Sequence, residues 1–279
     1  MSIRVYSCPF VDYNSAMLSR RLQPVLLIVG IVLLALWLQT TPPGLLGKAD
    51  AIGYAVCHRI DLRSFHMGER ALPLCARCTG MYLGAMLGLL FQALTAPRHG
   101  GLPEKRLWPP LLLLALAFAV DGGNSYLHFF PGAPGLYEPN NILRLLTGTG
   151  VGLVMAAFVY PAFHQTMWKR WVDKPALQDY RSLGLLILLA LLADALVLTE
   201  NPLLLYPLAL ISAGGVLVLL SMVYGMLWMM LWRIENTLER PGQTVVPLLI
   251  GLVFGLLQIA FLDFLRYQLT GTWDGFHLG

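Results

Sequence analysis

The chain has 279 residues, of which 57% are hydrophobic and 12% charged, and its formal net charge is +4. Because soluble globular domains carry about 25% charged residues, this composition excludes an ordinary soluble protein and indicates an integral membrane protein. The positive charge forms no basic stripe, which excludes nucleic acid as a partner. We therefore predict an all-α fold, one polytopic bundle of transmembrane helices over residues 1–279 in contact with the lipid bilayer.

Seven apolar runs are long enough to cross a bilayer, which takes about 20 residues. The second run is short and carries Gly80, Gly84 and Gly88 along one side, a spacing that predicts close contact with a neighbouring helix. No signal-peptide cleavage site follows the first run, so we expect all seven to be spans. They are Leu22–Thr40, Thr79–Ala96, Leu107–Tyr126, Ile142–His164, Ser182–Glu200, Leu203–Trp232 and Val245–Arg266.

The distribution of Lys and Arg predicts the orientation, because cytoplasmic loops are enriched in both residues. The loops after the third and fifth runs contain neither. The count predicts a cytoplasmic N-terminus and a multi-pass protein of the cell (inner) membrane. The residues that define the cytoplasmic side are Arg4, Arg20, Arg21, Arg98, Lys105, Arg106, Lys169, Arg170, Lys174, Arg181, Arg233 and Arg240.

The loop between the first two runs breaks this rule. The count places it outside the cytoplasm, yet it carries Lys48, Arg59, Arg63, Arg70 and Arg77. A loop outside the cytoplasm normally contains few Lys and Arg residues, because these residues set the orientation of the chain. We therefore expect partners or a ligand to hold them. The alternative is that the first run does not cross the membrane.

Three of the four cysteines lie in the same loop, as Cys57 and the pair Cys75-x-x-Cys78. The pair directly precedes Thr79, a candidate N-cap, so the helix dipole and the charge of Arg77 favour thiolates. A thiolate is both a metal ligand and a redox nucleophile. The pattern therefore leaves open both the chemistry and whether the chain is an enzyme.

Three interpretations of these cysteines remain. In the first, Cys57, Cys75 and Cys78 bind zinc with His58 or His66 as the fourth ligand; adjacent side chains diverge, which favours His66. In the second, the dithiol Cys75 and Cys78 passes two electrons to a quinone and becomes a reversible disulfide, with Cys57 as the exchanging thiol, although an odd number of cysteines argues against it. In the third, two thiols form a structural disulfide; otherwise the cysteines are free, inert thiols.

Ionisable residues within the runs mark a second feature, because charges inside a membrane are costly. Under the predicted topology they all fall in the outer half of the membrane, beneath the loop. We therefore predict an outward-facing polar cavity with the loop as its lid, and we expect Asp121 to pair with Arg144. The ionisable residues are Asp121, Arg144, Asp194, Glu200, Asp263 and Arg266.

Arginines at such a cavity are suited to clamp a phosphate or a carboxylate, as on a lipid head group. The competing interpretation is that they pair with Asp61, Glu69 and Asp121, or with anionic lipid. The residues that we expect to line the ligand pocket are Arg59, Arg63, Ser64, Arg77, Thr79, Asp121, Asn141, Arg144, Thr147 and Asp194.

Several strings of the loop resemble a known family. They are Cys57-His58-Arg59, Arg63-Ser64-Phe65, the string from Pro73 to Gly80, and Tyr82-x-Gly84, followed by Asp121-Gly122 and by Asn141-x-x-Arg144-x-x-Thr147-Gly148. The family is the domain of unknown function 2085, uncharacterised predicted membrane proteins of bacteria and archaea. The resemblance covers roughly residues 54–152 and implies a membrane location but no activity. Residues 182–266 would be three additional spans.

The leading hypothesis is a membrane protein whose zinc-stabilised loop covers a pocket for a small anionic or lipid-like ligand. One alternative is a membrane thiol–quinone oxidoreductase that uses Cys75 and Cys78. The other is a non-catalytic accessory subunit that has partners in a larger membrane complex.

Overall fold

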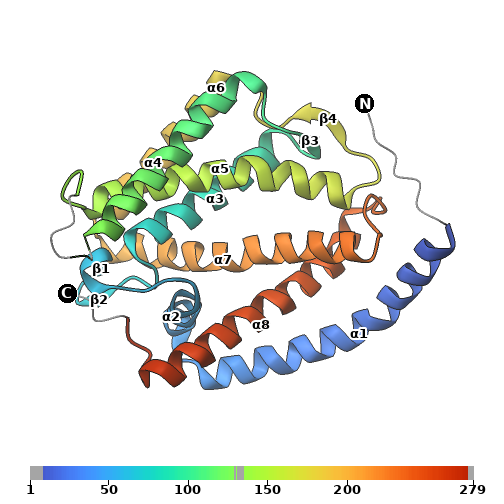
Figure 1. The fold of residues 1–279 in the computed structure, drawn as a ribbon, viewed down its shortest axis with the longest axis horizontal. Helices are drawn as coiled ribbons and strands as arrows, with labels where there is room; N and C mark the ends of the chain where they lie inside the picture. Colours follow the sequence, from blue (N-terminus) through green and yellow to red (C-terminus); the bar gives the residue numbers. More distant parts are fainter. Residues whose placement is uncertain (1–8, 129, 131–134, 276–279) are drawn as a thin grey trace.

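A computed structural model describes residues 9–128, 130 and 135–275, with the backbone alone for residues 9–20. This part of the chain forms the helical bundle shown in Figure 1. Its α-helices are α1 (Pro9–Thr40), α2 (Gly44–Val56), α3 (Ala76–Thr95), α4 (Trp108–Leu127), α5 (Asn141–Met167), α6 (Tyr180–Leu198), α7 (Pro202–Leu231) and α8 (Val245–Thr270).

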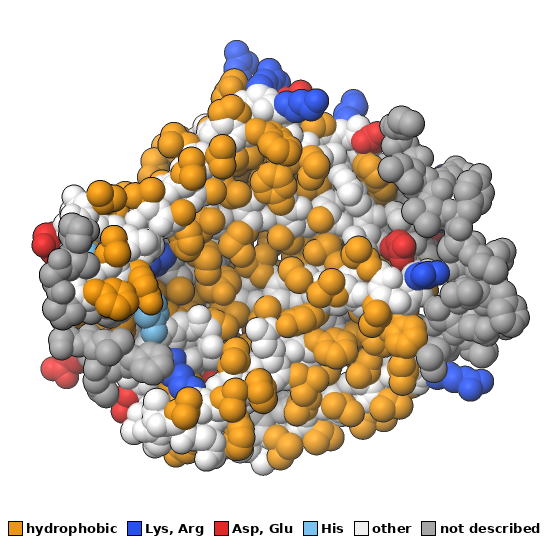
Figure 2. Space-filling model, in the orientation of Figure 1, with side chains coloured by type: hydrophobic (Ala, Val, Ile, Leu, Met, Phe, Trp, Pro, Cys, Tyr) orange, Lys and Arg blue, Asp and Glu red, His pale blue; other side chains and the backbone are white. Residues whose placement is uncertain are grey.

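Seven of the described helices are long and apolar enough to cross a membrane, which confirms the predicted bundle of about seven spans. Figure 2 shows hydrophobic side chains spread over the broad face of the bundle, while Lys and Arg lie toward its edges. The candidate spans are Arg21–Thr40, Ala76–Thr95, Lys105–Leu127, Asn141–Met167, Tyr180–Leu198, Pro202–Leu231 and Pro241–Thr270.

Helix α2 was not expected from the sequence. Its 13 residues are too few to cross a bilayer. Pro42 and Pro43 separate it from α1, with Pro43 in the N-cap position, where a missing backbone N–H costs nothing. The helix buries Ala51 and Tyr54 completely and packs against α7 and α8. As a result, the chain that follows α2 starts directly on the bundle.

Helices α3 and α5 form the closest pair of the bundle. A Cβ added to Gly148 of α5 would lie only 2.1 Å from the carbonyl oxygen of Arg77 in α3, so only glycine allows this approach. Gly80 and Gly84 contribute from the α3 side, as their spacing predicts. Figure 1 shows α4 and α6 on one side of this pair and α7, α8 and α1 on the other.

Short elements connect the helices at the two ends of the bundle. At one end, next to α2, β1 (His66–Met67) and β2 (Arg70–Ala71) pair antiparallel, with His66 opposite Ala71 (Figure 1). At the other end, β3 (His99–Gly101) and β4 (Val172–Pro175) pair in parallel. The 3-10 helices are η1 (Asp61–Arg63), η2 (Lys105–Leu107) and η3 (Pro241–Thr244).

Candidate metal site and arginine cluster

The cysteine loop is folded onto the bundle. Phe65, Leu72 and Leu74 are buried in the hydrophobic core and hold the loop between its two cysteine-bearing ends. Gly53 of α2 lies against the carbonyl of Pro73, so closely that a Cβ there would be 1.9 Å from that oxygen. This contact brings the chain before Cys57 next to the chain before Cys75.

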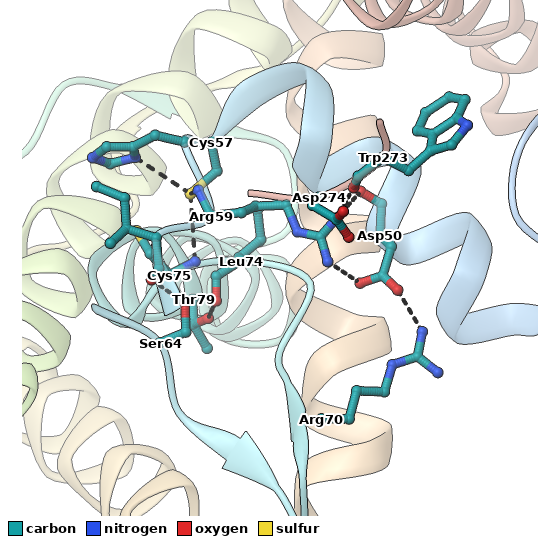
Figure 3. Close-up of polar contacts among 12 residues, drawn as sticks. Asp50, Cys57, Arg59, Ser64, Arg70, Leu74, Cys75, Thr79, Trp273 and Asp274 are labelled. Carbon is teal, nitrogen blue, oxygen red and sulfur yellow. Dashed lines mark hydrogen bonds and ion pairs between the residues drawn. The ribbon is translucent and has the colours of Figure 1, made fainter. Parts of the chain in front are cut away.

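Three candidate metal ligands converge where these two segments of the chain meet. The ligand atoms of Cys57, His58 and Cys75 all lie within 4.8 Å of one another, and Cys57 Sγ is 3.8 Å from His58 Nδ1 (Figure 3). Cys78, one turn into α3, interacts with the thiols of both Cys57 and Cys75. A tetrahedral zinc ion with bonds of about 2.0–2.3 Å needs ligands roughly 3.5 Å apart, so small side-chain movements suffice.

The environment of Cys57 favours a thiolate. Hydrogen bonds from the thiols of Cys75 and Cys78, and smaller contributions from His58 and the backbone of Cys75, hold the pKa of Cys57 well below its ordinary value despite burial. Its Sγ also accepts backbone hydrogen bonds from Arg59 at 3.5 Å and Cys75 at 3.4 Å. The same arrangement raises the pKa of Cys75 to about 12, because its thiol is the donor to Cys57 and is itself buried.

This donor set fits a divalent cation with an affinity for sulfur. Thiolates bearing backbone N–H donors and an imidazole are the ligands that zinc prefers. Without a cation, one proton can leave the cluster at low cost and the next cannot, since like charges would lie a few ångströms apart in a buried site. The three described cysteines, Cys57, Cys75 and Cys78, are free thiols.

His66 does not join this group. Its Nε2 lies 2.9 Å from Asp61 Oδ1 on the exposed hairpin side of the loop. The sequence favoured His66 because neighbouring side chains diverge along an extended chain. In the structure, however, His58 Nδ1 lies 3.8 Å from Cys57 Sγ, so these two adjacent side chains converge.

Helix α8 holds the backbone of this segment. Arg266 Nη1 donates to the carbonyls of Tyr54 and Cys57, both at 2.6 Å, and Nη2 donates to the carbonyl of His58 at 3.2 Å. A cavity of about 390 Å³ lies between α2 and α8, lined by Cys57, His58 and Arg266. The sequence marked Arg266 as a membrane charge, but nothing local indicated that its partners lie more than 200 residues away.

Several expected pocket residues stabilise the loop itself. Arg59 Nη2 pairs with Asp50 Oδ1 at 2.8 Å, and Arg70 also pairs with Asp50 (Figure 3). The hydroxyl of Ser64 donates to the carbonyl of Ile60. Thr79 is not the N-cap of α3, a position that Cys75 occupies. Its hydroxyl instead donates to the carbonyl of Leu74 at 3.1 Å.

A second polar group surrounds Asp121 of α4. Its carboxylate forms a buried ion pair with Arg77, whose Nε lies 3.1 Å from Oδ2. It also accepts hydrogen bonds from Tyr137 at 2.9 Å and Thr147 at 3.3 Å. The expected pair of Asp121 with Arg144 is therefore wrong. The close packing of α3 on α5 brings Arg77 to the carboxylate, while Nη1 of Arg144 donates to Asn141 Oδ1 at 2.8 Å.

Arg63, Arg77 and Arg144 form what we call the arginine cluster. Burial and the charge of Arg77 lower the pKa of Arg63. The Arg144 side chain is close enough to Arg63 and Arg77 for the three positive charges to repel one another. Arg144 is 6% exposed, and its Nε has no hydrogen-bond partner among the described residues. Asn141 connects this cluster to the loop by donating to the carbonyls of Leu62 and Ser64.

Asp194, near the C-terminal end of α6, contacts a different residue of α5. Its Oδ1 accepts a hydrogen bond from Thr149 at 2.7 Å, and the residue is 2% exposed. The described contacts of Asp194 do not include the loop or the arginine cluster. The structure thus gathers most of the expected residues at one end of the bundle, as two adjoining groups.

The comparisons with known proteins point to one family of membrane proteins. Residues 57–158 match the family described as predicted membrane protein (DUF2085), a stretch that contains the loop, α3, α4 and most of α5. An uncharacterized protein of Methanocaldococcus jannaschii is 28% identical over 122 residues, which are 43% of this chain and 72% of the relative. An uncharacterized protein of Methanothermobacter thermautotrophicus is 32% identical over 101 residues, 36% of this chain and 81% of the relative. No solved structure matches the chain.

Proposed function

Because the chain belongs to the DUF2085 family of predicted membrane proteins, we propose that its loop binds a zinc ion and presents an anion-binding site. The proposed ligands are Cys57, His58, Cys75 and Cys78. The single observation that carries the zinc proposal is the convergence of the ligand atoms of Cys57, His58 and Cys75 within 4.8 Å of one another. When bound, zinc supplies a rigid four-way junction and the positive charge that compensates the thiolates.

A closed site of four protein ligands is structural, because no coordination position stays open for a substrate. The ion would join the end of α2 to the start of α3, where Arg77 begins its contact with Asp121. The segment between the ligands also carries Arg63. The ion would therefore fix the positions of two members of the arginine cluster.

The arginine cluster supports an anion as the ligand. Arg77 is paired with Asp121, whereas the buried Arg144 has an Nε without a hydrogen-bond partner among the described residues. Excess positive charge in a half-buried site is costly unless an anion compensates it. Guanidinium groups bind phosphate and carboxylate with two hydrogen bonds. The proposed ligand is accordingly a small phosphate- or carboxylate-bearing molecule, or the head group of an anionic lipid.

Metal analysis of the purified full-length protein tests the zinc proposal. We expect about one zinc per chain, and we expect Cys75→Ser and His58→Ala to lose it. The chain offers two matched controls, His66→Ala in the same loop and Cys8→Ser outside it, and both should keep the ion. A metal-free wild-type protein would overturn the proposal, and loss of zinc in His66→Ala but not in His58→Ala would overturn the ligand assignment.

The contact of Cys57 with both other thiols also favours the thiol–quinone oxidoreductase as a second candidate. In that reaction Cys75 and Cys78 lose two electrons and two protons to form a disulfide, and a quinone takes them up to become a quinol. Mass spectrometry of alkylated protein would detect a Cys75–Cys78 disulfide that forms on addition of quinone. Protein that holds stoichiometric zinc and forms no disulfide would exclude this candidate.

A further inference from the structure

A second cavity lies between α1 and α8, next to the loop end of the bundle. Its volume is about 410 Å³, within the range of small-molecule sites. It is distinct from the cysteine loop and the arginine cluster, since no residue of either one lines it. The residues that line it are Leu33, Leu36, Trp37, Thr40, Thr41, Ala260, Asp263, Phe264, Tyr267 and Trp273.

The cavity contains one buried carboxylate, that of Asp263, which is 4% exposed. Oδ2 accepts a hydrogen bond from the indole Nε1 of Trp37 at 3.2 Å. Oδ1 has no hydrogen-bond partner among the described residues. A carboxylate within a membrane span is costly and marks a functional site, and a buried oxygen without a donor lacks the partner that such atoms normally have.

The nearby basic side chains direct the following hydrogen bonds to other groups, while Lys48 Nζ lies 5.9 Å from the Trp37 ring and the charge of Arg266 acts on Asp263. Lys48 donates to the backbone carbonyls of Leu38 and Thr41 and to the Thr41 hydroxyl. Arg266 donates to carbonyls of the chain that follows α2. The ion pairs found in the described part of the chain do not include Asp263.

Aromatic rings form much of the cavity wall. Trp37, Phe264, Tyr267 and Trp273 line it, and the rings of Tyr267 and Trp273 lie 5.6 Å apart. Faces of aromatic rings attract cations, most strongly when the site excludes water. The hydroxyl of Thr40 donates to the carbonyl of Leu36, which leaves its oxygen able to accept another hydrogen bond.

We propose that this cavity binds an organic ammonium group, with Asp263 as its counter-ion and the aromatic side chains as its walls. A bare divalent metal ion fits poorly, because it needs several oxygen ligands and finds one free carboxylate oxygen. An anion would be repelled by Asp263. The ammonium group could belong to a free amine or to an amine-bearing lipid head group, since the cavity lies where two spans meet the membrane.

Titration calorimetry with choline, on full-length protein in nanodiscs of phosphatidylglycerol, tests this site. The neutral isostere 3,3-dimethylbutanol is the matched probe without charge. We expect wild-type protein to bind choline and not the isostere, and we expect Asp263→Asn to bind choline at least tenfold more weakly. Asp194→Asn removes another buried membrane carboxylate away from the cavity and should bind like wild type.

A second arm separates the two sources of the ammonium group. Nanodiscs that also contain phosphatidylethanolamine are analysed by native mass spectrometry for lipid retained on the protein. Retention that is lost in Asp263→Asn identifies the head group as the ligand. Trp273→Leu, which changes the wall outside the spans, should weaken binding several-fold and covers the case that Asp263→Asn fails to fold. Equal binding of choline and its isostere, unchanged binding in the folded variants, or no binding of choline or phosphatidylethanolamine would overturn the proposal.

Discussion

The two ends of the bundle both carry basic residues, but they use them differently. At the end with β3 and β4, Lys169 pairs with Glu239 while both side chains stay about 60% exposed. At the loop end, the Arg77 side chain is 16% exposed and its partner Asp121 is 1% exposed. Both pairs join residues that are far apart in the chain, but the first stays in contact with solvent, whereas the second is buried between packed helices.

This difference explains the loop that violates the charge rule. Under the predicted orientation, the arginines at the β3 end would lie on the cytoplasmic side, where Lys and Arg are enriched. At the loop end, Arg59 and Arg70 share Asp50, and Arg77 pairs with Asp121. The expectation that partners hold these arginines is therefore met for three of them. Arginines in a loop that the charge rule places outside the cytoplasm therefore indicate a structural or ligand-binding role, and they do not report the orientation of the chain.

The largest effect is expected when a strong chelator removes the proposed zinc ion. Zinc binding is worth about 10 kcal/mol or more in small zinc domains, so residues 57–78 should lose most of their protection from hydrogen exchange. The β3–β4 end should keep its protection, because it shares no ligand with the loop. Equal protection of the loop before and after chelation would contradict a structural role for the ion.

The next effect concerns the buried ion pair. Arg77→Leu leaves the Asp121 carboxylate buried without its partner, and we expect a loss of about 3–5 kcal/mol in the free energy of unfolding. Unfolding in detergent by titration with dodecyl sulfate measures it. The double variant Arg77→Leu with Asp121→Leu should recover much of the loss. A cost as small as that of an exposed pair would show that water reaches Asp121.

A smaller effect is expected for the proposed anion site. Arg144→Gln removes one guanidinium of the arginine cluster, and we expect inorganic phosphate to bind about tenfold more weakly, which is roughly 1.4 kcal/mol. Calorimetry measures the affinity. Arg98→Gln is the matched control at the opposite end, where the guanidinium stacks 4.2 Å from the Trp168 ring. Equal losses in both variants would point to a general charge effect instead of a site.

The sequence predicted the spans well because a long run of apolar residues is by itself enough to indicate a segment that lies in lipid. The predicted Val245–Arg266 begins where α8 begins and ends within four residues of it. Helix α2 was missed for the complementary reason. It is short and carries Lys48 and Asp50, so neither length nor hydropathy distinguishes it from a loop, and its burial depends on α7 and α8.

The residues of the site could be predicted from the sequence, but the contacts between them could not. The sequence identified the cysteines, both histidines and the arginines of the loop, since such residues are rare in spans. The pairing of Arg77 with Asp121 depends on the glycine-mediated approach of α3 to α5. The placement of His58 depends on its side chain turning toward that of Cys57, with 3.8 Å between Nδ1 and Sγ. Neither long-range packing nor the direction of a single side chain is encoded in residue type alone.

The smallest expected effect is at the opposite end, where Lys169 holds the pKa of Glu239 below its ordinary value through a hydrogen bond and its charge. A lowered pKa in the folded state stabilises the fold above the ordinary glutamate pKa and is lost as the pH falls through the lowered value. Because both side chains are exposed, Glu239→Gln should leave the melting temperature at pH 7 within experimental error. Wild type and variant should also converge fully in acid. A clear loss of stability at pH 7 would mean that this end, too, depends on buried pairing, and the contrast between the two ends would fail.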